Sequence, residues 1–212
     1  MKTIVLLFAT LLSIPLVRGQ IKKNKIIFNL GIQKSDLSHK IFYAETTDGW
    51  VTTSQSSTTL VDINLLYEMG LQKSRFSPTF GIGFNQKGFV DKGFNSLSDP
   101  FATYFTATNK HSFISLIAGM HYKLFNTKRT NLLIGQYLIP DYNLNHNAIY
   151  KTIAFSTKSA LILEYRLNPK FIIYFSPFYT FSISNYNSKK LQQNSADYRP
   201  VSLGINFGLG LQ

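Results

Sequence analysis

The stretch V-S-L-G-I-N-F-G-L-G-L-Q, from Val201 to Gln212, alternates apolar residues with small or polar ones along its whole length. A period of two predicts a β-strand with one apolar face. The opposite face carries Gly, Ser, Asn and Gln rather than the Lys, Glu or Thr of a soluble strand, which suits the crowded interior of a small barrel. We expect such a strand at the end of the chain to close an outer-membrane barrel.

Seven earlier stretches alternate in a similar way. They lie at about residues 25–33, 58–70, 75–86, 110–124, 131–139, 152–167 and 170–184. Long polar connections alternate with short turns between them, which is the pattern of a bacterial outer-membrane barrel with both termini in the periplasm. The sequence therefore predicts an all-β fold, an eight-stranded antiparallel up-and-down transmembrane β-barrel over residues 20–212. Ten strands, with parts of 39–46 and 101–107 forming an added hairpin, remain open.

Two of the predicted strands contain proline on the apolar face. Pro78 and Pro177 each remove one hydrogen bond from a strand ladder, so we predict bulges there. The stretch 131–139 is the least regular, because Leu132-Leu133-Ile134 breaks the alternation.

Residues 1–19 have the features of a cleaved signal peptide. Lys2 supplies a positive start, an apolar segment runs from Ile4 to Val17, and cleavage is expected before Gln20. We therefore expect an exported protein in the cell outer membrane. The chain contains no cysteine, which excludes disulfides and thiolate metal sites.

The chain is strongly basic. Its 22 Lys and Arg and 10 Asp and Glu give a net charge of +12, which becomes +10 without Lys2 and Arg18. We interpret this charge as a basic loop surface facing lipopolysaccharide or peptidoglycan. Nucleic acid is not an expected partner of an exported protein.

Aromatic residues fall in two groups on the predicted lipid-facing side, as in the interfacial girdles of membrane barrels. One group, at the expected periplasmic ends of the strands, contains Tyr67, Phe76, Tyr122, Tyr165 and Phe171. The other group, at the opposite ends, contains Phe84, Phe155 and Phe181. A soluble β-sandwich has no reason to place aromatic residues in this way.

The segment F-G-I-G-F-N-Q-K-G, from Phe80 to Gly88, resembles the PorT-like outer-membrane β-barrel family of Bacteroidota. The apolar strand 112–124, the glycine-containing strand 132–138, Gln20 after the signal and the closing L-G-I-N-F-G-L-G-L extend the resemblance over most of residues 20–212. The resemblance implies an eight-stranded outer-membrane barrel. Named members of the family assist type IX secretion, and no catalytic residues come with it.

Several charged residues fall on the predicted inner face, where an eight-stranded barrel has room for side chains and no wide pore. They are Asp62, Glu68, His121, Lys123, Lys158, Glu164 and Arg166. Because an unpaired buried charge costs several kcal/mol, we predict a network of salt bridges that fills the lumen. We expect Glu68, Glu164 and Arg166 to share one cluster. A proton or ion path is the functional alternative.

Catalytic and metal sites find little support. A lipid-A-modifying enzyme would need a nucleophile, a base and an orienting acid, and His111 with Ser112, Ser115 or Ser156 lacks an evident acid. The other histidines, His39, His121 and His146, show no metal-binding spacing. We expect no cofactor and no metal ion.

The sequence thus favours a non-enzymatic outer-membrane barrel with a structural or accessory role. This role is membrane integrity, assistance to a secretion system, or adhesion through the long loops 34–57 and 87–109. We expect a monomer that contacts outer-membrane lipid and lipopolysaccharide, with other envelope or secretion proteins as a further class of partner. A lipid-A-modifying enzyme and a soluble periplasmic barrel that binds an apolar ligand are the alternatives. The soluble barrel would need its apolar faces inside.

Overall fold

A computed structural model of the chain describes residues 24–38, 50–71, 74–95, 103–145, 151–186 and 198–212. The predicted signal peptide 1–19, the segment 39–46, His39 and His146 lie outside these residues. The strands are β1 (Lys25–Leu37), β2 (Trp50–Ser56), β3 (Thr58–Glu68), β4 (Phe76–Asn95), β5 (Thr103–Asn126), β6 (Thr130–Asn143), β7 (Ile153–Arg166), β8 (Phe171–Ser182) and β9 (Pro200–Leu211).

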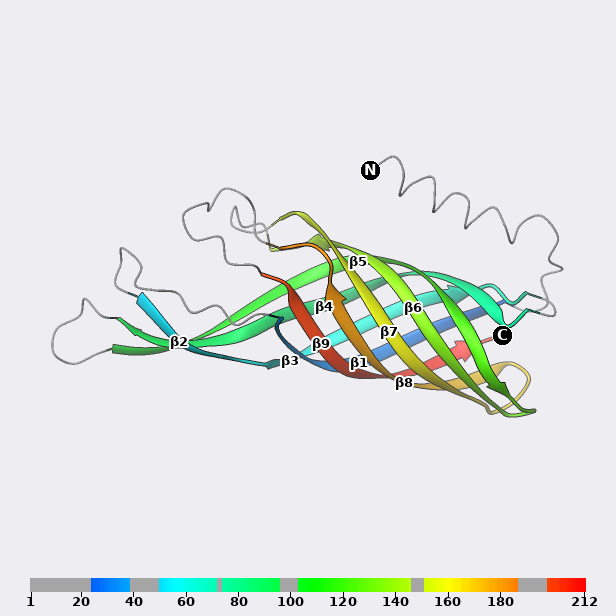
Figure 1. Cartoon of the computed structure of the whole chain (residues 1–212). Coiled ribbons are helices and arrows are strands. Elements are labelled where there is room, and N and C mark those ends of the chain that lie inside the picture. Colours follow the sequence, from blue (N-terminus) through cyan, green and yellow to red (C-terminus); the bar gives the residue numbers. More distant parts are fainter. Residues whose placement is uncertain (1–23, 39–49, 72–73, 96–102, 146–150, 187–197) are drawn as a thin grey trace.

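Eight of these strands form a closed antiparallel ring in the order β1-β3-β4-β5-β6-β7-β8-β9, with β9 paired back to β1 (Figure 1). The predicted eight-stranded up-and-down barrel is therefore confirmed. Lys25 and Leu211 lie at the same end of the ring as the short β5–β6 and β7–β8 turns. We call this end the turn end and the opposite one the loop end.

Two of the barrel strands extend far beyond the ring at the loop end (Figure 1). β4 and β5 stay paired in one register from Phe76↔Tyr122 to Asn95↔Thr103, and β2 joins the outer part of β4. The predicted loop 87–109 is therefore largely strand, because the alternation continues through it with polar residues. Residues 103–107 belong to β5 rather than to an added hairpin, and β2 lies outside the ring.

The prolines interrupt the ladders without shifting them. Pro78 pairs with Met120 and Pro177 pairs with Ile205 in unbroken registers, so the predicted bulges do not form there. Pro78 lies just beyond the last β3–β4 pair, and the β7–β8 pairing is interrupted at Pro177, so neither proline N has to donate to a ladder at that point. A register shift occurs instead in β5, between Lys123 and Phe125.

The ring is apolar outside and mostly polar inside. Exposed Ile, Leu and Phe side chains line the outer face, and Leu203, Phe207 and Leu209 are each more than half exposed. The inner positions hold buried charged and amide side chains together with an apolar cluster that includes Ile27, Leu133 and Ile162. Leu133 explains the broken alternation of β6, because its side chain points into the lumen and is fully buried.

The small inner face of β9 allows close packing against β1. Gly31 pairs with Asn206, and Gly208 pairs with Asn29. A Cβ atom on either glycine would overlap the amide oxygen of the asparagine opposite. The Gly and Asn alternation therefore fits these two strands together where the ring closes.

Candidate functional site

A cluster around Lys25 fills the lumen at the turn end. Lys25 Nζ lies 2.6 Å from Glu164 Oε1 and 3.0 Å from Glu68 Oε1, and all three side chains are nearly inaccessible to solvent. Asn131 Nδ2 donates to the second oxygen of Glu164 at 2.8 Å. One cation from the first strand thus joins carboxylates from β3 and β7.

The same cluster continues through a histidine. His121 Nδ1 lies 2.7 Å from Glu68 Oε2, and His121 Nε2 lies 2.5 Å from the hydroxyl of Tyr137. One ring nitrogen of His121 thus bonds the Glu68 carboxylate and the other bonds the Tyr137 hydroxyl. The His121 side chain is 1% exposed, so the chain of hydrogen bonds is sealed from bulk water.

A second ion pair lies between Lys158 of β7 and Asp62 of β3. Lys158 Nζ donates to Asp62 Oδ2 at 2.6 Å, and Asn64 Nδ2 donates to the same oxygen at 2.8 Å. The ammonium also lies 3.8 Å from the centre of the Phe178 ring, within range of a cation–π interaction.

A third cluster closes the lumen at the loop end around Asp141. Lys87 Nζ donates to Asp141 Oδ2, to Ser156 Oγ at 3.0 Å and to the Tyr186 hydroxyl at 2.6 Å. Asp141 also accepts from Tyr186 at 2.7 Å, from Ser156 at 2.8 Å and from Ser115 at 2.5 Å. Every polar atom of the Asp141 carboxylate is thus bonded to protein.

The three clusters leave little free space between them. A cavity of about 20 Å³ lies between the two clusters nearer the turn end, with His121, Tyr137, Lys158 and Tyr174 in its lining. That volume holds about one or two water molecules. Among the described residues, the lumen is therefore a closely packed interior around these clusters.

The structure brings together most, but not all, of the predicted inner charges. Asp62 pairs with Lys158, and Glu68 and Glu164 share one cluster. Arg166 does not join them, because β7 ends at this residue and the guanidinium turns to the rim, where Nη1 donates to the Lys128 carbonyl at 3.4 Å. Lys123, which precedes the register shift in β5, is only half-buried.

Sequence reasoning missed the lysines and the aspartate that complete the clusters. Lys87 and Asp141 lie just beyond the predicted ends of their strands, and Lys25 is the first residue of β1. The period of two could have found them. Lys87 falls two residues after the inward Asn85, Asp141 two after Ile139, and Lys25 two before Ile27.

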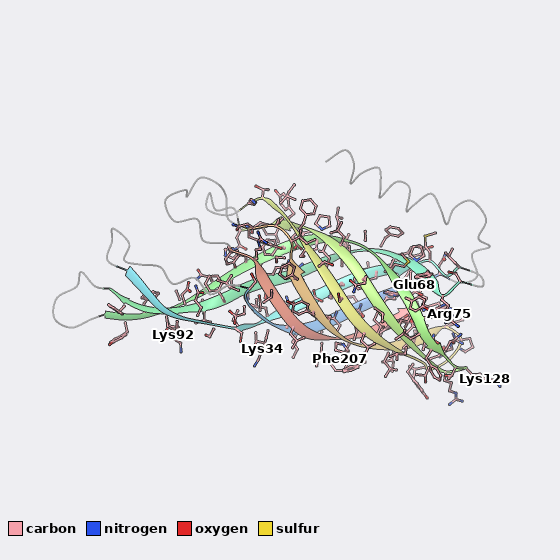
Figure 2. The ribbon with its side chains drawn as sticks, in the orientation of Figure 1. Lys34, Glu68, Arg75, Lys92, Lys128 and Phe207 are labelled. Atoms are coloured by element: carbon pink, nitrogen blue, oxygen red, sulfur yellow. The ribbon has the colours of Figure 1, made fainter. Side chains whose placement is uncertain are left out.

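The predicted girdle residues all occupy outward positions. Tyr67, Phe76, Tyr165, Phe171 and Phe155 are exposed, and Tyr122, Phe84 and Phe181 are half-exposed. The Phe76 and Tyr122 rings lie 4.9 Å apart on neighbouring strands. Figure 2 shows Phe207 on the barrel wall between the ends, with Lys34 and Lys92 toward the loop end and Arg75 and Lys128 at the turn end.

The candidate catalytic residues are not assembled for nucleophilic chemistry. Ser115 and Ser156 each donate their single hydroxyl proton to Asp141, so neither donates to a histidine base. His111 is buried and lies against the Tyr198 ring.

Among the described residues, no three His, Asp or Glu side chains come together as a metal site. No helix in this part of the chain is long and apolar enough to cross a membrane.

No protein-family model matches the sequence, and no curated protein matches it either. Solved structures do match the fold. The chain aligns with Neisserial surface protein A (NspA) at a TM-score of 0.54 and 9% identity, over 91% of this chain and 98% of that one. The outer membrane protein OprG from Pseudomonas aeruginosa matches at 0.44 and 10% identity, over 91% of this chain and 97% of OprG.

Ail, the attachment invasion locus protein of Yersinia pestis, matches at 0.40 and 12% identity, over 90% of this chain and 99% of Ail. At these identities the similarity concerns the fold alone. The chain has the eight-stranded fold of small outer-membrane barrels.

Proposed function

We propose that this chain is a non-enzymatic outer-membrane β-barrel protein with a structural or accessory role in the cell envelope. The observation that carries the proposal is the reversed distribution of polarity. The exposed face is a band of Leu, Ile and Phe, whereas charged and amide side chains are buried inside. In water this arrangement would expose a large apolar surface, but in a bilayer it satisfies both faces of the sheet.

A soluble barrel for an apolar ligand requires the opposite arrangement. Its apolar faces would line the interior, yet the interior here holds Lys25, Glu68, Asp62, Lys158 and Asp141 in hydrogen-bonded clusters. The packed lumen also speaks against transport through the barrel. We therefore assign the activity of the protein to its surfaces.

The extension of β4 and β5 is the surface best suited to a partner outside the cell. On one of its faces, Gln55 and Asn109 donate to the two oxygens of Asp91 at 2.9 and 2.6 Å, which ties β2, β4 and β5 together. The other face presents Lys92 and Lys110, with Tyr104 81% exposed. This sheet is a preformed, basic surface, which fits lipopolysaccharide or another envelope protein.

The predicted signal peptide and the membrane-type fold support a location in the cell outer membrane. We propose that the barrel is a monomer there. The PorT-like resemblance supports a secretion-associated role as the specific form of this function. Neither the two serines bonded to Asp141 nor His111 supplies an activated nucleophile, which favours the accessory role over a lipid-A-modifying enzyme.

A deletion strain tests the proposal. The strain is complemented with the wild-type chain, with a variant in which a short turn replaces residues 90–107, and with His111→Ala. We expect deletion to change envelope permeability or protein secretion. The shortened variant should reach the membrane but not return the strain to wild-type behaviour, whereas His111→Ala should return it fully. A deletion strain with altered lipid A that the wild-type chain corrects and His111→Ala does not would establish the enzyme instead.

A further inference from the structure

The turn end of the barrel carries a pocket lined by three cations. Lys128 and Arg129 come from the β5–β6 turn and Arg166 from the end of β7, and we call these three residues the basic rim. They line an open pocket of about 430 Å³ together with Leu167, Asn168, Pro169 and Gln212. Figure 2 shows Lys128 at the extreme turn end of the molecule.

Backbone contacts hold the two sides of this pocket together. The Arg166 N–H donates to the Arg129 carbonyl at 2.7 Å, and Arg166 Nη1 donates to the Lys128 carbonyl at 3.4 Å. The β7–β8 turn is fixed in its own right, because Asn168 Oδ1 accepts from the N–H groups of Lys170 and Phe171. The turns that carry the three cations are therefore ordered in their backbone, and Arg166 is also held by its side chain.

Within the part of the chain that the structure describes, no acidic side chain is paired with the basic rim. Of the Asp and Glu residues that the structure describes, Glu68 and Glu164 lie at the turn end, and Lys25 binds both inside the lumen. The Nε–H of Arg166 is shielded from solvent and has no hydrogen-bond partner among the described residues, although buried donors are normally satisfied.

Apolar side chains border the basic rim on the outer wall of the barrel. Leu167 is 55% exposed and lines the pocket itself. Tyr165 is exposed two residues before it on β7, and Phe125 is exposed near the end of β5, three residues before Lys128. A ligand that matches both parts has an anionic head and an alkyl chain. Arginine and lysine bind phosphate through charge-assisted hydrogen bonds, and basic pockets at membrane interfaces bind anionic lipid head groups.

We propose that the basic rim binds the phosphate of an anionic phospholipid in the inner leaflet of the outer membrane, with an acyl chain against Leu167 and Phe125. The inference rests on the proposed function, because that function places the turn end at the periplasmic interface. The site would fix the depth and orientation of the barrel in the membrane.

Native mass spectrometry of the folded barrel in a neutral detergent tests the site, with phosphatidylglycerol and phosphatidylethanolamine supplied at equal concentration. We expect the wild-type protein to retain phosphatidylglycerol at least fivefold over phosphatidylethanolamine. Lys128→Gln/Arg129→Gln/Arg166→Gln should abolish this preference. The control Lys34→Gln/Lys92→Gln/Lys110→Gln removes the same charge at the loop end and should keep the preference.

The inference is overturned by equal retention of the two lipids, by an unchanged preference in the rim variant, or by an equal loss in the control. Displacement by glycerol phosphate at the same concentration would mean a site for soluble phosphate and would overturn the lipid assignment. If the triple variant does not fold, Lys128→Gln/Arg129→Gln, confined to an exposed turn, replaces it.

The gel mobility of each sample reports whether the barrel is folded. A wild-type chain that never folds as a barrel counts against the proposed function. A folded barrel without a lipid preference counts against the basic rim alone.

Discussion

Lys25 Nζ lies 2.6 Å from Glu164 Oε1, and this bond crosses the lumen between two strands that are not neighbours in the ring. β1 is paired with β3 and β9, whereas β7 is paired with β6 and β8. The contact therefore fixes the shape of the barrel interior in a way that no backbone ladder does. It also makes the first strand dependent on carboxylates far away in the sequence.

Lys25→Met should strongly destabilise the barrel. It leaves Glu68 and Glu164 buried without their shared cation, and loss of one partner of a buried ion pair costs about 3–5 kcal/mol. Urea unfolding in lipid vesicles measures the free energy. Lys34→Met removes an exposed lysine from the same strand and should change it by less than about 0.5 kcal/mol. Equal values for the two variants would show that the Lys25 cluster does not stabilise the fold.

At the loop end, Lys87 and Asp141 should behave as one unit. Lys87→Met and Asp141→Asn each leave a buried polar group without its charged partner, so each should destabilise the barrel. The double variant should lose less than the two single losses added together, with a coupling of about 0.5–3 kcal/mol. A double-mutant cycle of unfolding free energies measures this coupling, and strict additivity would contradict the direct pairing.

Gly31→Ala should destabilise the seam between β1 and β9. The new Cβ overlaps Asn206 Oδ1, and overpacking of this kind costs about 1–3 kcal/mol. Asn206→Gly in the same chain should recover part of the loss, because it removes the side chain that is struck. The fraction of folded protein on refolding into vesicles reports both effects. If the double variant folds no better than Gly31→Ala alone, the contact with Asn206 is not the cause of the loss.

The extension of β4 and β5 should become less protected as pH rises. Burial raises the pKa of the Asp91 carboxyl above its ordinary value. The carboxyl therefore binds its proton more tightly when the extension is folded than when it is locally unfolded. Its stability is thus greatest at acid pH and falls as Asp91 ionises. Hydrogen exchange over residues 86–95, corrected for the intrinsic pH dependence, should show this loss, and Asp91→Asn should remove it. An unchanged pH dependence in the variant would assign the effect to another group.

Much of the fold could be predicted from the sequence, because lipid and lumen impose opposite polarity on successive residues of each strand. The prediction was poorest where this constraint ends. The extension around Asp91 meets water on its outer face, where Lys92 and Lys110 stand among apolar residues. The alternation is therefore weak there, and the sequence predicts loops instead of strands. The sequence predicts bulges at Pro78 and Pro177, but each proline lies where the ladder on one side of its strand ends or breaks, and the ladder on the other side keeps its register.

The candidate site was less predictable for a related reason. Alternation gives the direction of a side chain within a strand but not its partner across the lumen, so Lys25 could not be assigned to Glu164 in advance. At the last residue of a strand, alternation does not predict even whether the side chain points inward or outward. Arg166 follows the inward pattern in sequence, yet it lies at the rim with Lys128 and Arg129 because no further strand holds it inside.

The most direct test of the account is the gel mobility of the protein from outer-membrane fractions, compared between boiled and unboiled samples. Closed membrane barrels resist unfolding by detergent until they are heated. The account predicts that the protein is found in the outer-membrane fraction and that boiling shifts its mobility. A protein that is free in the periplasm and shows no shift on boiling would contradict the membrane barrel, and with it the functions proposed for both of its ends.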